Sequence, residues 1–238
     1  MQLTIYPANK RGVANHGWLK SFHSFSFAQF YNPKLMNFGL LRVLNDDTVS
    51  GGMGFGTHGH DNMEIISIAL EGELKHKDSM GTEAIIRQGD VQIMSAGTGI
   101  RHSEQNNSSE KEVKFLQIWI IPKNRNISPR YDQRNFSDEA LKNKMLTVVA
   151  PDKPGEAIYI NQDAYLSLGV FDTDSMIEYK IQNSGNGAFV FVLEGEVKIG
   201  SHSLGKRDAI GIEDSEIFEI EISKNSTVLL IDVPMAEE

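Results

Sequence analysis

Short apolar or alternating runs, separated by turn-forming residues, dominate this chain of 238 residues and limit the folds it can adopt. The clearest runs are residues 63–70, 84–86, 91–94, 113–121, 165–170, 188–193 and 227–233. Gly, Asn, Asp and Ser fill most of the gaps between them, and helical periodicity is scarce. The pattern is typical of β-sandwiches and barrels, so we predict an all-β fold with few short helices.

A short internal repeat divides the chain into two halves. The sequence LEGELK at residues 70–75 recurs as LEGEVK at residues 193–198, each time after an apolar run. Hairpin turns favour such residues anyway, but the similar strand patterns around both copies indicate a duplication. Residues 122–154 hold four of the seven prolines and the best helix candidate, residues 138–145, which Ser137 can cap. We interpret this stretch as a connection between two β-barrel domains.

Charge and composition exclude several classes of function. The net charge is −9, and residues 143–238 carry 7 Lys and Arg against 17 Asp and Glu. Such an acidic surface repels phosphate backbones, so we expect no direct binding of nucleic acid. The absence of cysteine excludes thiolate metal sites and disulfides. With no apolar run long enough to span a membrane and no signal-peptide pattern at its start, the chain is expected to be cytoplasmic and without membrane contact.

Two residue pairs with a spacing of two indicate a metal site. His58 and His60 form one pair, and His102 and Glu104 form the other. Side chains two positions apart point to the same face of a strand, so two strands could direct all four residues at one ion. Glycines precede both pairs and allow sharp turns there. Three imidazoles and a carboxylate suit a divalent first-row transition metal and leave coordination positions for substrate or oxygen.

The surroundings of these pairs resemble the two sequence motifs of the cupins. The matching positions are Gly52, His58, His60 and Gly72 for the first motif, and Gly89, Gly97, Gly99, His102 and Asn106 for the second. The first motif usually supplies a carboxylate as well, but Glu64 lies one position too close to His60. A shift of one position turns a strand side chain to the opposite face, so Glu64 is not an expected ligand. Glu104 takes the place of that carboxylate.

The carboxylate in the second motif is a feature in which the chain resembles the pirins, a family of bicupins. The likeness is greatest to bacterial pirin-like quercetin dioxygenases. The segments that carry it are residues 16–19, 25–27, 31–33, 56–64, 97–104 and 117–120. It implies two jelly-roll domains, a metal-binding cupin domain at residues 1–135 and a degenerate cupin domain without metal ligands at residues 136–238.

The second half lacks a comparable ligand set. The positions that match the first histidine pair, 123 residues later, hold Ile181 and Asn183, and His202 is solitary. We therefore expect one divalent transition metal ion per chain. Fe²⁺ is favoured, and Mn, Co, Ni, Cu and Zn are compatible with the same ligands.

The resemblance also implies an activity. Pirin-like quercetin dioxygenases are oxidoreductases that cleave the 2,3-bond of flavonols such as quercetin with O₂ and release carbon monoxide. A small aromatic molecule and O₂ are then the expected partners, and Glu104 would be both a metal ligand and the catalytic base. Two alternatives stay open: a redox-responsive regulatory pirin that binds transcription factors without turnover, and a cupin enzyme that acts on another small molecule.

Several further side chains are weaker candidates for the site. Gln117 could bind a substrate oxygen or a metal ligand, although a buried amide that bonds to the backbone is the commoner role. Phenylalanines between residues 22 and 30 could line an entrance for a flat aromatic, but such residues more often form core. His16 and His23 are expected to be structural or exposed. His76 follows a turn that resets the strand register, so we do not include it.

Overall fold

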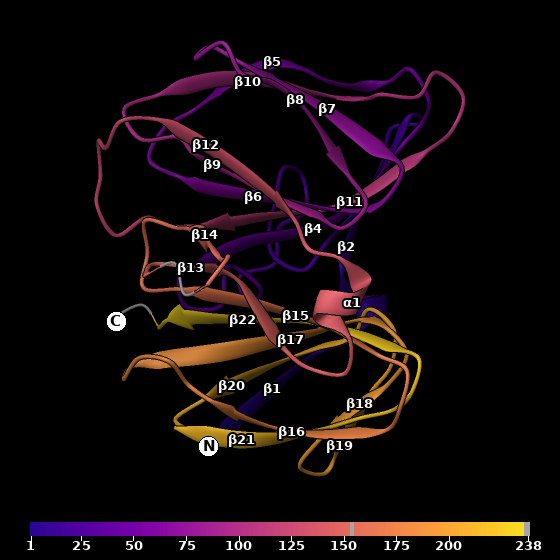
Figure 1. Cartoon of the computed structure of the whole chain (residues 1–238), viewed down its shortest axis with the longest axis vertical. Helices are drawn as coiled ribbons and strands as arrows, with labels where there is room; N and C mark the ends of the chain where they lie inside the picture. The colour runs from indigo at the N-terminus through magenta and orange to yellow at the C-terminus, as the bar shows by residue number, and fades with distance from the viewer. Residues whose placement is uncertain (153–154, 236–238) are drawn as a thin grey trace.

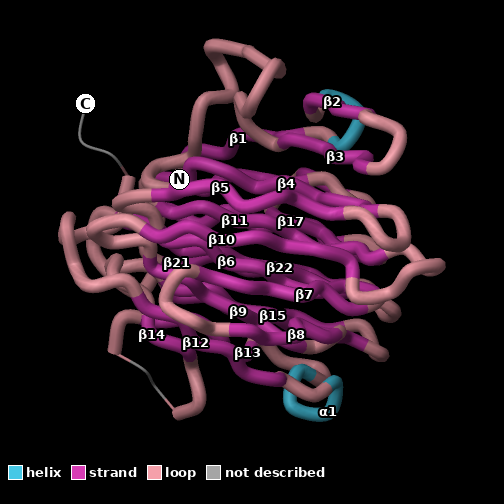
Figure 2. The backbone as a smooth tube through the Cα atoms, turned by 90° about the horizontal axis from the view of Figure 1, so that it is seen from above, coloured by secondary structure: helices cyan, strands magenta, loops and turns pink. Residues whose placement is uncertain are grey.

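Antiparallel strands dominate the structure, a computed structural model that describes residues 1–152 and 155–235 (Figure 1). They form four sheets, stacked in the order four-, seven-, seven- and four-stranded. Each half of the molecule is a sandwich of one seven-stranded and one four-stranded sheet, and the seven-stranded sheets lie in the middle. Viewed from above, the strands of successive layers run in similar directions (Figure 2). The predicted all-β fold with two barrel-like halves is confirmed.

The first half encloses the interior in which the predicted ligands lie. Its seven-stranded sheet consists of β12 (Arg130–Asn135), β9 (Asp90–Ser95), β6 (Glu64–Glu71), β11 (Val113–Ile120), β4 (Leu41–Val49), β3 (Leu19–His23) and β2 (Gly12–Asn15), in spatial order. The four-stranded sheet consists of β5 (Gly54–His60), β10 (Ile100–Asn106), β7 (Glu73–Asp78) and β8 (Glu83–Arg87). Both predicted ligand pairs are therefore on neighbouring strands, β5 and β10.

The second half repeats this arrangement. Its seven-stranded sheet consists of β1 (Gln2–Tyr6), β20 (Ala209–Glu213), β17 (Asn186–Glu194), β22 (Ser226–Pro234), β15 (Tyr165–Phe171), β13 (Leu146–Ala150) and β14 (Ile158–Tyr159). The four-stranded sheet consists of β16 (Ser175–Lys180), β21 (Ile217–Ile222), β18 (Val197–Ile199) and β19 (His202–Leu204). Because β1 pairs with β20, residues 2–6 lie in the second sandwich, whereas the expected ranges 1–135 and 136–238 assign them to the first. The boundary near residue 135 stays a prediction.

Helical structure is short. A 3₁₀ turn covers Ala8–Lys10, and α1 covers Asp138–Leu141, where the Ser137 hydroxyl accepts a hydrogen bond from the Ala140 N–H at 3.3 Å. The helix ends before the predicted residue 145 because Asn143 adopts a φ of 52° and its N–H bonds to the Val170 carbonyl of β15. The stretch that we interpreted as a connection, residues 122–154, also contains β12 and β13. Among the described residues, no helix is long and apolar enough to cross a membrane.

The largest apolar core lies between the two seven-stranded sheets. It contains Leu44, Ile66, Leu116 and Ile118 of the first half and Leu166, Phe189, Phe191, Leu229 and Ile231 of the second. On β11 these are the even-numbered positions, so the odd-numbered ones face the interior of the first sandwich. One strand thus presents an apolar face to the second half and another face to the candidate site.

Partly or fully buried polar contacts also join the two halves. Asp46 on β4 accepts hydrogen bonds from Arg207 Nε at 2.8 Å and from Arg11 Nη1 at 3.2 Å. Glu64 accepts from the backbone N–H of Asn161 at 3.2 Å and is 1% exposed. Glu64 therefore faces the second half, away from the histidines, as its place in the strand predicts.

Phe189→Ala is expected to destabilise the protein by about 3–5 kcal/mol, because it leaves a cavity in this central core. Phe189 is fully buried, and its ring centre lies 5.0 Å from that of Tyr6 and 5.5 Å from those of Phe25 and Phe38. Urea denaturation measures the change, with the exposed Met176→Ala as the control. A loss below about 1 kcal/mol would contradict the assigned role of this core.

Candidate metal centre

Three histidines converge at one end of the first sandwich. His58 and His60 are on β5, and His102 on β10 lies directly opposite His58 in the antiparallel register. The ring centres are 4.5 to 5.0 Å apart, and the Nε2 atoms of His58 and His102 are separated by 3.1 Å. One nitrogen from each of the three lies within 4.8 Å of the others. The period-two argument from the sequence thus brings these side chains together.

The geometry fits a transition metal ion. Ligands at about 2.1 Å from one ion, at right angles to each other, are about 3 Å apart, which is close to the His58–His102 separation. Nδ1 of His58 lies 2.8 Å from the Gly56 carbonyl oxygen, so Nδ1 carries the proton. The lone pair of Nε2 is therefore free to bind a metal ion. This backbone contact orients the ring toward the other two histidines.

Burial keeps two of the three imidazoles, those of His60 and His102, in the form that binds metal. It lowers the pKa of His102 to about 3, and the neighbouring His58 and His60 add to the effect. Burial and the nearby His58 lower the pKa of His60 to about 4. Both rings are therefore neutral at physiological pH, and no proton has to leave them when a cation binds.

Glu104 lies beside the cluster but bonds to the opposite sheet. A bulge follows His102 in the pairing with β5, so Glu104 is opposite Phe55. One carboxylate oxygen accepts from Ser67 Oγ at 3.1 Å and the other from Gln117 Nε2 at 3.0 Å. Burial, which these hydrogen bonds oppose, raises the pKa of Glu104 to about 7. Its role as the fourth ligand stays a prediction.

The structure adds His76, which we did not expect at the site. His76 on β7 pairs with Glu104, and one nitrogen or oxygen atom from each of His76, His102 and Glu104 lies within 4.8 Å of the others. Its Nε2 is 3.1 Å from the Asp78 carboxylate, and both residues are buried. In the sequence, the spacing of two between His76 and Asp78 indicated that both side chains share one face of a strand. This signal was missed because the sequence does not show that β7 lies next to β10.

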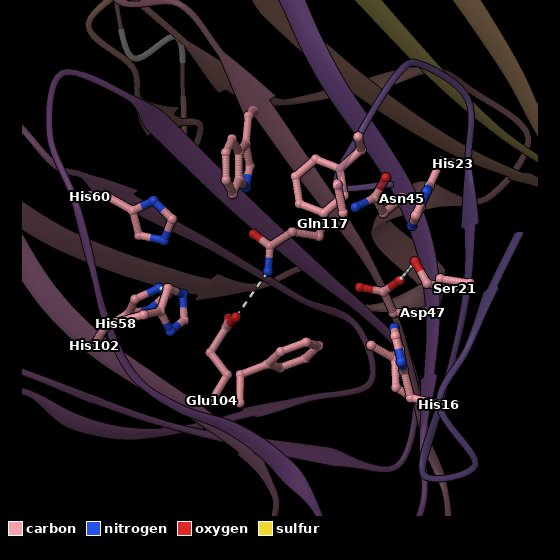
Figure 3. Close-up of a pocket in the computed structure, with 16 residues that line it drawn as sticks. His16, Ser21, His23, Asn45, Asp47, His58, His60, His102, Glu104 and Gln117 are labelled. Atoms are coloured by element: carbon pink, nitrogen blue, oxygen red, sulfur yellow. Dashed lines mark hydrogen bonds between the residues drawn. The ribbon is translucent and has the colours of Figure 1, made fainter. Parts of the chain in front are cut away.

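A cavity of about 660 Å³, counted with its opening to solvent, lies between the sheets beside the histidines (Figure 3). Phe27 and Trp119 line it, so one of the four phenylalanines between residues 22 and 30 faces the site, whereas Phe25 belongs to the central core. His16 and His23 also line it, and His23 is buried rather than exposed.

The side-chain amide of Gln117 bonds to another side chain, and not to the backbone as we considered commoner. Its Nε2 donates to Glu104, a predicted ligand, and its Oε1 is buried without a hydrogen-bond partner among the described residues. Gln117 also lines the cavity, so it contacts the candidate centre and the space beside it.

The interior of the second half is a continuous apolar core. It includes Val190, Ile210, Ile220 and Leu230. The two groups of His, Asp and Glu side chains that could hold a metal among residues 1–152 and 155–235 are both in the first half.

Comparisons with known proteins agree with the two-part architecture. The family model named Pirin matches residues 7–120, and the model of the quercetinase C-terminal cupin domain matches residues 147–233. A quercetin 2,3-dioxygenase from Escherichia coli K12 is 43% identical over 230 residues, which cover 97% of this chain and 98% of that protein. A pirin-like protein from Caulobacter vibrioides is 35% identical over 227 residues, covering 95% and 97%. The crystal structure of an Escherichia coli bacterial pirin in complex with nickel(II) has a TM-score of 0.93, with 40% identity and coverage of 99% and 100%.

Removal of one cluster histidine is expected to weaken metal binding by at least about 100-fold, since loss of a hydrogen bond that only orients a metal ligand commonly costs 10- to 100-fold. His58→Ala, His60→Ala and His102→Ala are titrated with Ni²⁺ by calorimetry, and metal content is measured by elemental analysis. His202→Ala, in the second half, is the control. Wild-type affinity in any cluster variant would remove that histidine from the ligand set.

Glu104→Gln is expected to stabilise the metal-free protein at high pH. The carboxyl ionises near its ordinary value of 4.5 when unfolded and near 7 when folded, so the wild type loses stability as the pH rises between these values. The free energy of unfolding of the variant should therefore exceed that of the wild type by an amount that grows over this range and reaches roughly 1–3 kcal/mol above pH 7. Urea denaturation in chelator at several pH values measures it, with the exposed Glu112→Gln as control. A difference that does not change with pH would contradict the assignment.

Proposed function

The chain belongs to the pirin family, and we propose that it is a metal-dependent dioxygenase that cleaves the 2,3-bond of flavonols with O₂ and releases carbon monoxide. Both halves are cupin domains, and the first carries the candidate metal centre. The observation that carries the proposal is the cluster of three histidines at the wall of a cavity beside a buried carboxylate.

The cavity supports a flat aromatic substrate. Phe27, Phe55 and Trp119 line it, and the Trp119 ring packs edge-on against His60, with 5.0 Å between ring centres. Aromatic walls of this kind bind planar rings by offset or edge-to-face contacts. A substrate held between them would lie next to the histidine cluster and be shielded from bulk water.

Glu104 is the residue proposed to accept the proton of the flavonol 3-hydroxyl. A base is most effective when its pKa is near the working pH, and burial raises the pKa of Glu104 to about 7. Ser67 and Gln117 hold its two oxygens from the facing sheet, so the carboxylate is positioned before a substrate enters. A bound divalent cation would supply Lewis acidity that lowers the pKa of the coordinated hydroxyl.

His58, His60, His102 and Glu104 are the residues proposed to hold one ion. The nickel(II) complex of the Escherichia coli pirin is consistent with nitrogen and oxygen ligands of this kind. Fe²⁺ is our favoured native ion, because open positions on a histidine and carboxylate site suit oxygen chemistry.

The test is turnover of quercetin by protein reconstituted separately with Fe²⁺, Mn²⁺, Co²⁺, Ni²⁺, Cu²⁺ and Zn²⁺. We expect equal amounts of quercetin and O₂ consumed and carbon monoxide formed with at least one of these ions. Glu104→Gln with full metal content should lose about 10²- to 10⁴-fold in kcat, whereas Glu112→Gln should not. A metal-loaded wild type without turnover would contradict the proposal and favour a regulatory pirin.

A further inference from the structure

A row of buried polar side chains crosses the inner face of the seven-stranded sheet, opposite the metal ligands. We call it the polar row; its members are His23, Asn45, Gln117 and Ser67. They are direct cross-strand neighbours on β3, β4, β11 and β6. They therefore project from one face of the sheet, and their exposed fractions are between 0 and 8%.

Within residues 1–152 and 155–235, only two of the four side chains of the polar row have a hydrogen-bond partner. Gln117 and Ser67 donate to Glu104. The side chains of His23 and Asn45 make no hydrogen bond with any residue in the described parts of the chain, although both line the cavity. His23 Nδ1 and Asn45 Oδ1 are buried polar atoms without such a partner, which is rare in folded proteins.

A second cross-strand pair lies beside His23 and Asn45 on the same two strands. Ser21 on β3 is opposite Asp47 on β4, and its hydroxyl donates to one oxygen of the Asp47 carboxylate. No hydrogen bond from the described residues reaches the other oxygen, although Asp47 is 4% exposed. Figure 3 shows Asp47 facing across the cavity toward Glu104 and Gln117. An acceptor therefore lines the cavity wall away from the three histidines.

The fold itself does not require polar residues here. In the second half, the position 123 residues after Ser67 is Val190, which pairs with Leu230. The next residue across that sheet is Ser167, whose hydroxyl lies 3.3 Å from that of Thr147. The equivalent positions of the second half thus carry side chains that are apolar or bonded to each other, and no candidate site is present there among the described residues. The unpartnered groups of the first half are a property of its cavity.

We propose that Asn45 and Asp47 form a second substrate subsite, which binds a hydroxyl group on the part of an aromatic substrate that lies away from the metal centre. The inference rests on the proposed function, because it takes a flavonol bound at the metal as its other end. Asn45 Oδ1 and the second carboxyl oxygen of Asp47 are both acceptors without a donor in the described parts of the chain, so they select a substituent that donates a hydrogen bond. The subsite makes the enzyme specific for flavonols that are hydroxylated beyond the 3-position.

The test compares quercetin with 3-hydroxyflavone, which shares the 3-hydroxyl but lacks the other hydroxyls. Both are titrated into nickel-loaded protein without O₂, with binding followed by calorimetry. The wild type should bind quercetin at least about tenfold more tightly, since a substrate hydroxyl that bonds to a buried, unpaired acceptor removes the cost of leaving that acceptor without a donor. Asp47→Asn and Asn45→Ala should remove most of this preference and leave the Kd of 3-hydroxyflavone within about twofold. Asp172→Asn, at the surface, is the control.

The outcomes separate the two proposals. Equal affinity of the wild type for both ligands overturns the subsite, and so does an equal loss for both in Asp47→Asn, which would indicate a merely structural role. Turnover without a preference overturns the subsite alone. A preference that depends on Asp47, in a protein without turnover, supports the subsite and overturns the proposed reaction. Failure of both flavonols to bind overturns both.

Discussion

Two hydrogen bonds to one buried carboxylate connect the facing sheets of the first half. Ser67 and Gln117 on the seven-stranded sheet donate to Glu104 on the four-stranded sheet. A carboxylate removed from water without such donors would cost several kcal/mol or would remain protonated. These donors therefore allow an ionisable group to lie inside a β-sandwich next to three imidazoles. Because they come from the wall that also lines the cavity, the same contacts hold the carboxylate at the boundary between metal centre and substrate space.

The two halves use one architecture with different interiors. In the second half, apolar side chains from both sheets form one continuous core. In the first half, the interior apolar residues form two smaller clusters, one around Phe115 and one around Met94, and polar side chains and the cavity lie nearby. Burial of apolar surface is the main favourable contribution to folding, so the second half and the core between the halves compensate for a first half with a polar interior.

The strands of the first seven-stranded sheet serve both sides at once. Asp46 and Asp47 are neighbours on β4, yet Asp46 bonds to Arg207 of the second half, whereas Asp47 faces the cavity. On β11, Leu116 and Ile118 pack in the central core on either side of Gln117. Successive side chains of a strand point to opposite faces of the sheet, so one strand can contribute to both the central core and the cavity wall. Packing against the second half thereby fixes the position of the wall that faces the metal centre.

The sequence by itself determined the features that depend on local order. Run lengths and turn residues indicated an all-β fold, and the spacing of two placed His58 and His60 on one face of a strand. Motif spacing likewise showed that Glu64 points away from the histidines. Tertiary structure alone decided which strands became neighbours: β7 beside β10, which brings His76 to the centre, and β1 beside β20. The polar row also arises only from cross-strand register. Pairing between strands far apart in the chain depends on how whole sheets pack, and no local spacing encodes that register.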